Sequence, residues 1–255
     1  MGIETVTDWL GRTWAAATTR QPSPSPTTVL LSAVAVLVVL AVPVLWRLSR
    51  HALTIVHESA HAGVALLVGR RLSGIRVHSD TSGLTVSTGR PRGPGMVLTA
   101  VAGYPGPAVL GAGAAWLVSR GYALGLVWSL ILLVVLVLVQ VRNVYGLWAV
   151  LVTVVALAVV AVDGTPAVHS AAATTVTWFL LLGAPRAVLE MQVGRRRLRR
   201  RRSADSSDAG LLARLTRLPA GLWVGVLFLV CLAALALGAT WLVGPSDHGW
   251  WTRPG

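Results

Sequence analysis

The sequence predicts an all-α polytopic membrane protein with about seven transmembrane helices and a small β-hairpin after the second of them. Hydrophobic residues make up 55% of the 255 residues and charged residues only 12%, whereas soluble domains contain roughly a quarter charged residues. The apolar residues form runs close to the length of about 20 residues that a spanning helix needs. Between two of these runs, apolar and polar residues alternate around a turn, which is typical of a hairpin.

Residues 1–27 are mostly polar and contain the sequence QPSPSP, so we expect a flexible N-terminal tail. The apolar run that follows is too long for the core of a signal peptide, and we expect it to be retained as a span. A transmembrane domain then covers residues 28–243, and residues 244–255 form a C-terminal tail. The predicted spans are 28–46, 51–68, 95–118, 122–141, 144–162, 167–184 and 219–243.

All 22 basic residues are arginine, and the formal net charge is +13. Their distribution between the predicted spans places the N-terminus in the cytoplasm and the C-terminus outside, by the positive-inside rule. Only Arg47, Arg50, Arg120 and Arg253 then lie outside. Exclusive use of arginine, with abundant alanine, glycine and valine, is also typical of a GC-rich bacterial genome.

Seven arginines lie in RRRLRRRR (195–202), within a predicted basic cytoplasmic connection at 194–218. Beside a span, such a run contacts the anionic lipids of the inner leaflet, and we expect no nucleic-acid partner. The end of this connection, with Leu211, Leu212, Leu215 and Leu218 on one side, predicts a short amphipathic helix. The simplest interpretation is a helix that rests on the membrane surface.

The segment GIRVHSDTSGLTVSTG (74–89) predicts the β-hairpin, with a turn at residues 80–83. A solvated loop is the alternative interpretation. The segment AGYPGPAVLGAGAAW (102–116) is rich in small residues and proline, which indicates close helix packing and irregular backbone. The only cysteine, Cys231, excludes a disulfide framework and a cysteine-rich zinc site.

The sequence TIVHESAHAGVALLVG (54–69) places a His-Glu-x-x-His pattern inside a predicted span. His57 and His61 are four residues apart, so on a helix both imidazoles can reach one ion. Glu58 is offset by about 100°, which lets its carboxylate address a water on that ion without binding the ion. Zinc suits neutral imidazole ligands and a position left open for water. The alternative is a pair of neutral histidines hydrogen-bonded within the bundle, beside a protonated Glu58.

The segment HESAHAGVALLVGRRLSGIRVHSDTSGLT resembles the zinc-site region of bacterial members of the site-2 protease family, in which a short β-hairpin follows a His-Glu-x-x-His helix. The segments AGYPGPAVLG, VRNVYG and SSDAGLLARLTRLPAGLWVG are also similar to that subgroup, so the resemblance covers most of residues 51–243. It implies zinc bound by His57 and His61, with Glu58 as the general base.

The chain departs from the family at the third zinc ligand, which is an aspartate of a Leu-Asp-Gly motif in well-characterised members. Asp163-Gly164 falls at the outer end of the fifth predicted span, and we discount it. Asn143 is better placed but is a weak neutral ligand. Asp208 has suitable chemistry, but its connection would have to fold back into the bundle. Asp80, at the hairpin turn, is a further candidate.

We therefore expect a zinc-dependent intramembrane metalloprotease that hydrolyses a membrane-anchored protein. The hairpin would receive the unwound substrate by strand addition. The main alternative is a catalytically inactive relative that serves as a membrane scaffold or regulator, which the missing third ligand favours. A small-solute transporter is disfavoured because the chain shows no internal repeat.

Overall fold

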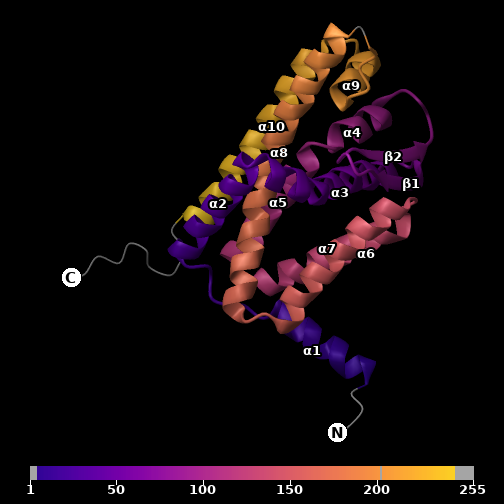
Figure 1. Ribbon diagram of the computed structural model, residues 1–255. Coiled ribbons are helices and arrows are strands. Elements are labelled where there is room, and N and C mark those ends of the chain that lie inside the picture. The colour runs from indigo at the N-terminus through magenta and orange to yellow at the C-terminus, as the bar shows by residue number, and fades with distance from the viewer. Residues whose placement is uncertain (1–4, 202, 245–255) are drawn as a thin grey trace.

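A computed structural model describes residues 5–201 and 203–244 of this chain. It consists of helices and one two-stranded antiparallel sheet (Figure 1). The elements are α1 (Val6–Thr18), α2 (Pro26–Ala41), α3 (Pro43–Leu67), β1 (Arg71–Val77), β2 (Gly83–Thr88), α4 (Pro94–Ala102), α5 (Pro105–Ser119), α6 (Ala123–Gln140), α7 (Val144–Asp163), α8 (Pro166–Arg200), α9 (Asp208–Thr216) and α10 (Ala220–Val243).

Four of the described helices, α6, α7, α8 and α10, are long and apolar enough to cross a membrane. Two bent pairs raise the number to six at most: α2 with α3, bent by 106°, and α4 with α5, bent by 62°. The prediction of about seven spans therefore exceeds what the described residues contain. The difference arises at Val42, where the backbone becomes extended before Pro43, because proline cannot continue the hydrogen-bond ladder of the preceding helix.

The bend at Val42 turns α3 out of the direction of α2, so the predicted segments 28–46 and 51–68 are not two straight crossings (Figure 1). The predicted span 95–118 is likewise interrupted, at Gly103 and Tyr104 before Pro105. In contrast, α8 runs from Pro166 through most of the arginine run to Arg200, well beyond the predicted end at residue 184. It packs against α2, α5, α6, α7 and α10 and forms the centre of the bundle.

The N-terminal region, expected to be a flexible tail, contains helix α1. Thr5 and Asp8 form a reciprocal capping box at its start, which satisfies backbone N–H groups that would otherwise lack partners. Trp9 contacts the edge of Trp128 on α6, with ring centroids 6.0 Å apart. Local capping and this aromatic contact explain why a polar segment forms a helix. Of the predicted C-terminal tail, residues 245–255 lie outside the described residues.

The start of α2 and the end of α10 lie at the same end of the bundle (Figure 1). Just before α2, the Gln21 N–H donates to the Gly121 carbonyl in the turn after α5, at 2.8 Å. Near the end of α10, Gly238 packs beside Ala115, close to the end of α5. With each bent pair counted as one span, the described helices allow up to six crossings by length and composition, and an even number would return the chain to its starting side. The prediction of chain ends on opposite sides depended on seven crossings.

The small antiparallel sheet is confirmed, with Ile75 opposite Thr85 and Val77 opposite Gly83. The outer edge of β1 is occupied, because the Arg142 N–H donates to the Ile75 carbonyl at 2.9 Å. The Asn143 side chain also bonds both backbone groups of Val77, at 3.1 and 2.7 Å. Since the backbone groups of Ile75 and Val77 point away from β2, those of Thr85 and Gly83 point away from β1. The sheet therefore presents the backbone N–H and C=O groups of Gly83 and Thr85 along the outer edge of β2.

Candidate metal centre

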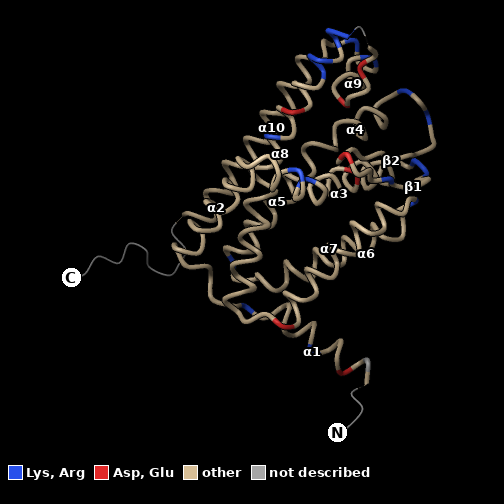
Figure 2. The backbone as a smooth tube through the Cα atoms, viewed as in Figure 1, with Lys and Arg blue, Asp and Glu red and all other residues tan. Residues whose placement is uncertain are grey.

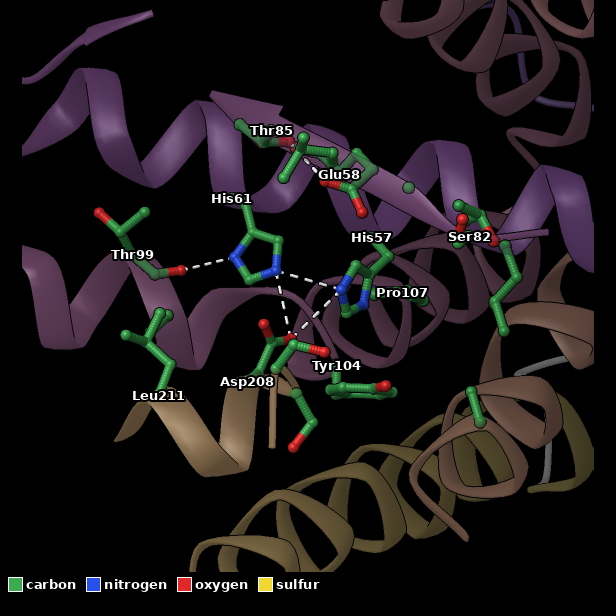
Figure 3. A pocket seen from close by; sticks show the side chains of 18 of the residues that line it. His57, Glu58, His61, Ser82, Thr85, Thr99, Tyr104, Pro107, Asp208 and Leu211 are labelled. Carbon is green, nitrogen blue, oxygen red and sulfur yellow. Dashed lines mark hydrogen bonds and ion pairs between the residues drawn. The ribbon is translucent and has the colours of Figure 1, made fainter. Parts of the chain in front are cut away.

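The two histidines of α3 and the first residue of α9 meet at a cavity of about 430 Å³. His57 and His61 project from one face of α3, as their spacing predicts, and Asp208 approaches them from the opposite wall (Figure 3). The imidazole Nε2 atoms are 3.1 Å apart. Each lies 3.3 Å from Oδ2 of Asp208. Among the described residues this trio is the cluster whose ligand atoms are close enough to share a metal ion.

The triangle of ligand atoms fits one face of a tetrahedral zinc site. Zinc binds nitrogen and oxygen at about 2.0–2.1 Å, so two ligand atoms of a tetrahedron lie about 3.3 Å apart. The observed edges of 3.1, 3.3 and 3.3 Å are close to this separation. Oδ2 of Asp208 is also buried and accepts no hydrogen bond within the described part of the chain. The donor set therefore fits zinc in both chemistry and geometry.

Asp208 reaches the histidines because the connection after α8 folds back toward α3 and α4. Ser207 caps α9, accepting a hydrogen bond from the Gly210 N–H at 3.2 Å. Asp205 accepts hydrogen bonds from the Ser207 hydroxyl at 2.6 Å and from Arg195 Nε at 2.7 Å. Partial burial alone would raise the pKa of the Asp205 carboxyl, but these bonds outweigh it and hold the pKa below its ordinary value.

His61 is oriented by the α4 backbone. Its Nδ1 lies 2.7 Å from the Thr99 carbonyl oxygen, a contact in which the ring N–H donates (Figure 3). This bond leaves Nε2 to face the cluster, as is usual for metal-binding imidazoles. The His57 ring packs edge to face against Tyr104, with centroids 4.6 Å apart. Both contacts come from the bent pair α4 and α5.

Gly103, at the bend between α4 and α5, lies directly against the two imidazoles. A Cβ atom at this position would overlap Nε2 of His61 and Cε1 of His57. The backbone of Gly103 is right-handed helical, so glycine is required here for space and not for an unusual dihedral angle. The same absence of a side chain lets α4 approach α3 closely enough for Thr99 to bond His61.

Glu58 is 4% exposed and is held by the hairpin. The Thr85 hydroxyl on β2 donates to Oε2 of Glu58 at 2.6 Å (Figure 3). A Cβ atom at Gly83 would overlap the same carboxylate, so the start of β2 packs directly on it. Thr54, one turn before Glu58, donates to the Thr81 carbonyl at 2.9 Å. The hairpin and α3 therefore form one wall of the cavity.

The structure separates the other third-ligand candidates from the histidines. Asn143 is engaged with the Val77 backbone, and Asp80 accepts hydrogen bonds from Ser82 within the hairpin turn. Asp163 ends α7, at the opposite end of that helix from Asn143. Sequence reasoning did not identify Thr85, Thr99, Gly103 or Arg195 as parts of the site. Of these four residues, only Gly103 lies in a segment that the sequence singled out, the small-residue segment at 102–116 that indicates close helix packing.

These features define a multi-pass membrane protein with a partly buried His-His-Asp cluster and a neighbouring glutamate. The model of the family described as Peptidase M50B-like matches residues 30–238. The chain belongs to this family, that of the site-2 proteases, and the resemblance found in the sequence is confirmed. Comparisons with curated proteins and with solved structures gave no match. The matched residues include all three members of the cluster and Glu58.

Replacing Gly103 with alanine should weaken zinc binding by about 10–100-fold, because the added methyl group would displace both imidazoles. Zinc titration of the purified protein measures the change. Gly113→Ala is the matched control, since a Cβ atom at this position of α5 meets nothing within 4 Å. Equal zinc affinity in the two variants would contradict the close packing of Gly103 on the cluster.

Proposed function

We propose that this protein is a zinc-dependent intramembrane metalloprotease that hydrolyses peptide bonds of a membrane-anchored protein. The observation that carries the proposal is the triangle formed by His57, His61 and Asp208, which matches a face of a tetrahedral zinc site. Asp208 supplies the oxygen ligand that the sequence pattern lacked. Membership of a peptidase family supports the same chemistry.

The alternative of two neutral, hydrogen-bonded histidines accounts for the 3.1 Å contact between the imidazoles but leaves Oδ2 of Asp208 without a donor. The Nδ1 proton of His61 is directed to the Thr99 carbonyl, so a neutral His61 presents a lone pair at Nε2. That lone pair would face the carboxylate oxygen of Asp208 at 3.3 Å. Two electron-rich atoms at this distance repel each other unless a proton or a metal ion lies between them. A zinc ion satisfies all three groups at once.

A zinc ion held by these residues would supply Lewis-acid activation of a water and of the scissile carbonyl. Glu58 is positioned to take the proton of the attacking water and to pass it to the leaving amine nitrogen. The Thr85 hydroxyl fixes the orientation of this carboxylate, because it donates to one oxygen at 2.6 Å. The second oxygen of Glu58 then carries the proton transfer. Burial by the hairpin excludes bulk water from the glutamate.

The outer edge of β2 is suited to hold an extended substrate next to Glu58. The backbone groups of Gly83 and Thr85 point away from β1, and both residues line the cavity. A substrate helix hides its peptide bonds within its own hydrogen bonds, so it must unwind before attack. Pairing with β2 offers the unwound backbone replacement hydrogen bonds and depends little on side chains.

Glu58→Gln should reduce cleavage by at least about 100-fold while zinc remains bound, because the amide cannot accept the water proton. Asp208→Asn should lose zinc, and Asp163→Asn, at the exposed end of α7, is its matched control. Zinc content and cleavage of a membrane-anchored substrate are measured on the purified proteins. Zinc-containing protein whose cellular function is unchanged by Glu58→Gln would instead support the inactive scaffold.

A transmembrane peptide that the enzyme cleaves provides a test of strand addition. N-methylation of single residues beside the cleaved bond should inhibit cleavage at every second residue, because a strand pairs through the backbone groups of alternate residues. Cleavage rates of the peptide series measure the pattern, and methylation far from the cleaved bond is the control. Inhibition without a two-residue period would contradict pairing with β2.

We further propose that the arginine-rich end of the bundle faces the cytoplasm, and that α2 begins and α10 ends on the extracytoplasmic side. Figure 2 shows basic residues gathered around the hairpin, the end of α8 and α9. The end that contains the start of α2 has few of them. This distribution agrees with the positive-inside rule for six crossings.

The orientation predicts the labelling of single cysteines by a membrane-impermeant thiol reagent on intact cells. Thr19→Cys, in the connection between α1 and α2, should be labelled, and Ser203→Cys, after α8, should be protected until the cells are opened. Both positions are exposed, and the native Cys231 is buried and gives no background. The reverse labelling pattern would overturn the orientation.

A further inference from the structure

We propose that a second hollow, at the end of α3, the end of the hairpin and the start of α4, binds the phosphate of an anionic phospholipid headgroup. This hollow has a volume of about 400 Å³, within the range of small-ligand sites. Apart from Met96, none of its lining residues lines the cavity of the metal centre. It is therefore a separate site, and the proposal does not depend on proteolytic activity.

The hollow is lined by three arginines and by no acidic residue. Arg70 is held within the protein, because it donates to the Ser87 hydroxyl at 3.1 Å and to the Arg90 carbonyl at 2.6 Å. The guanidinium groups of Arg90 and Arg92 have no hydrogen bond or ion pair within residues 5–201 and 203–244. Guanidinium groups match the geometry of phosphate oxygens and bind them in a bidentate manner.

The backbone leaves room for a ligand between these arginines. Gly69 and Gly93 have positive φ angles of 75° and 107°, and a Cβ atom at either position would meet nothing within 4 Å. The chain therefore turns sharply on both sides of the hollow without filling it. Helix α4 begins here without a side-chain cap, so the positive end of its dipole adds to the attraction for an anion.

Apolar side chains beside the hollow favour a lipid over a soluble phosphate. Leu66 and Leu67, at the end of α3, are 56% and 86% exposed, and Leu98 on α4 is 54% exposed. A soluble anion would have no use for these side chains, whereas the acyl chains of a phospholipid would cover them. The connection between β2 and α4, which lines the hollow, also lies at the arginine-rich end of the molecule (Figure 2). This combination of charged and apolar groups matches the boundary between headgroups and acyl chains.

The test is the binding of phosphatidylglycerol to the full-length protein in detergent, measured by native mass spectrometry with phosphatidylcholine as the reference lipid. Arg90→Gln combined with Arg92→Gln should weaken phosphatidylglycerol binding by about 30-fold, since each basic residue contributes about fivefold near anionic lipid. Arg71→Gln combined with Arg76→Gln removes the same charge from exposed positions of β1 that do not line the hollow, and is the matched control. Zinc content verifies that each variant is folded.

Selective loss of phosphatidylglycerol in the Arg90 and Arg92 variant, with the control unchanged, would support the site. Equal loss in both variants would overturn it, because binding would then follow net charge alone. Leu67→Ser should also weaken lipid binding, and an unchanged affinity would overturn the lipid assignment. Displacement of phosphatidylglycerol by millimolar inorganic phosphate would likewise show that a soluble phosphate is the preferred ligand.

Discussion

The close approach of Asp208 to the two imidazoles is the constraint on which the rest of the structure depends. Three electron-rich atoms lie within 3.3 Å of one another at a largely buried position. Such a cluster is unfavourable without a cation, so the surrounding protein must hold it together. The Arg195 and Asp205 pair holds the connection before α9, and the Thr99 carbonyl holds His61. The contact between His61 and Thr99 joins residues 38 positions apart, whereas Arg195 and Asp205 are ten positions apart.

Interruptions in the helices are concentrated around this cluster. The bends at Val42 and Gly103 both set the direction of segments that line the metal centre. Backbone that leaves the helical conformation at membrane depth must be covered by protein or line a cavity, because lipid cannot satisfy its polar groups. The bends therefore have a structural reason: they bring α4 and the hairpin against the histidine face of α3. With each bent pair counted as one span, the described helices allow at most six crossings, and the start of α2 and the end of α10 lie at the same end of the bundle.

The hairpin connects the two sites that we propose. Its second strand presents Thr85 to Glu58 at the metal centre, and its end leads into the segment with Arg90 and Arg92 at the second hollow. Helix α4 also contributes to both, through Thr99 at one site and its first turn at the other. A bound phospholipid would thus contact the elements that orient His61 and Glu58. The proposed catalytic site and the proposed lipid site therefore lie on neighbouring parts of the same short segment.

The sequence by itself determined the features that depend on local spacing. The four-residue interval between His57 and His61 fixes their common face on any helix, and alternation around residues 80–83 was sufficient to predict the sheet. The overall hydropathy was sufficient to predict a membrane protein. It predicted more spans than the described helices allow, because hydropathy does not reveal the 106° bend between α2 and α3. Only the tertiary structure distinguished Asp208 from Asn143 as the partner of the histidines. That choice depends on how the connection after α8 folds back, which is set by contacts between residues far apart in the chain and leaves no pattern in the local sequence.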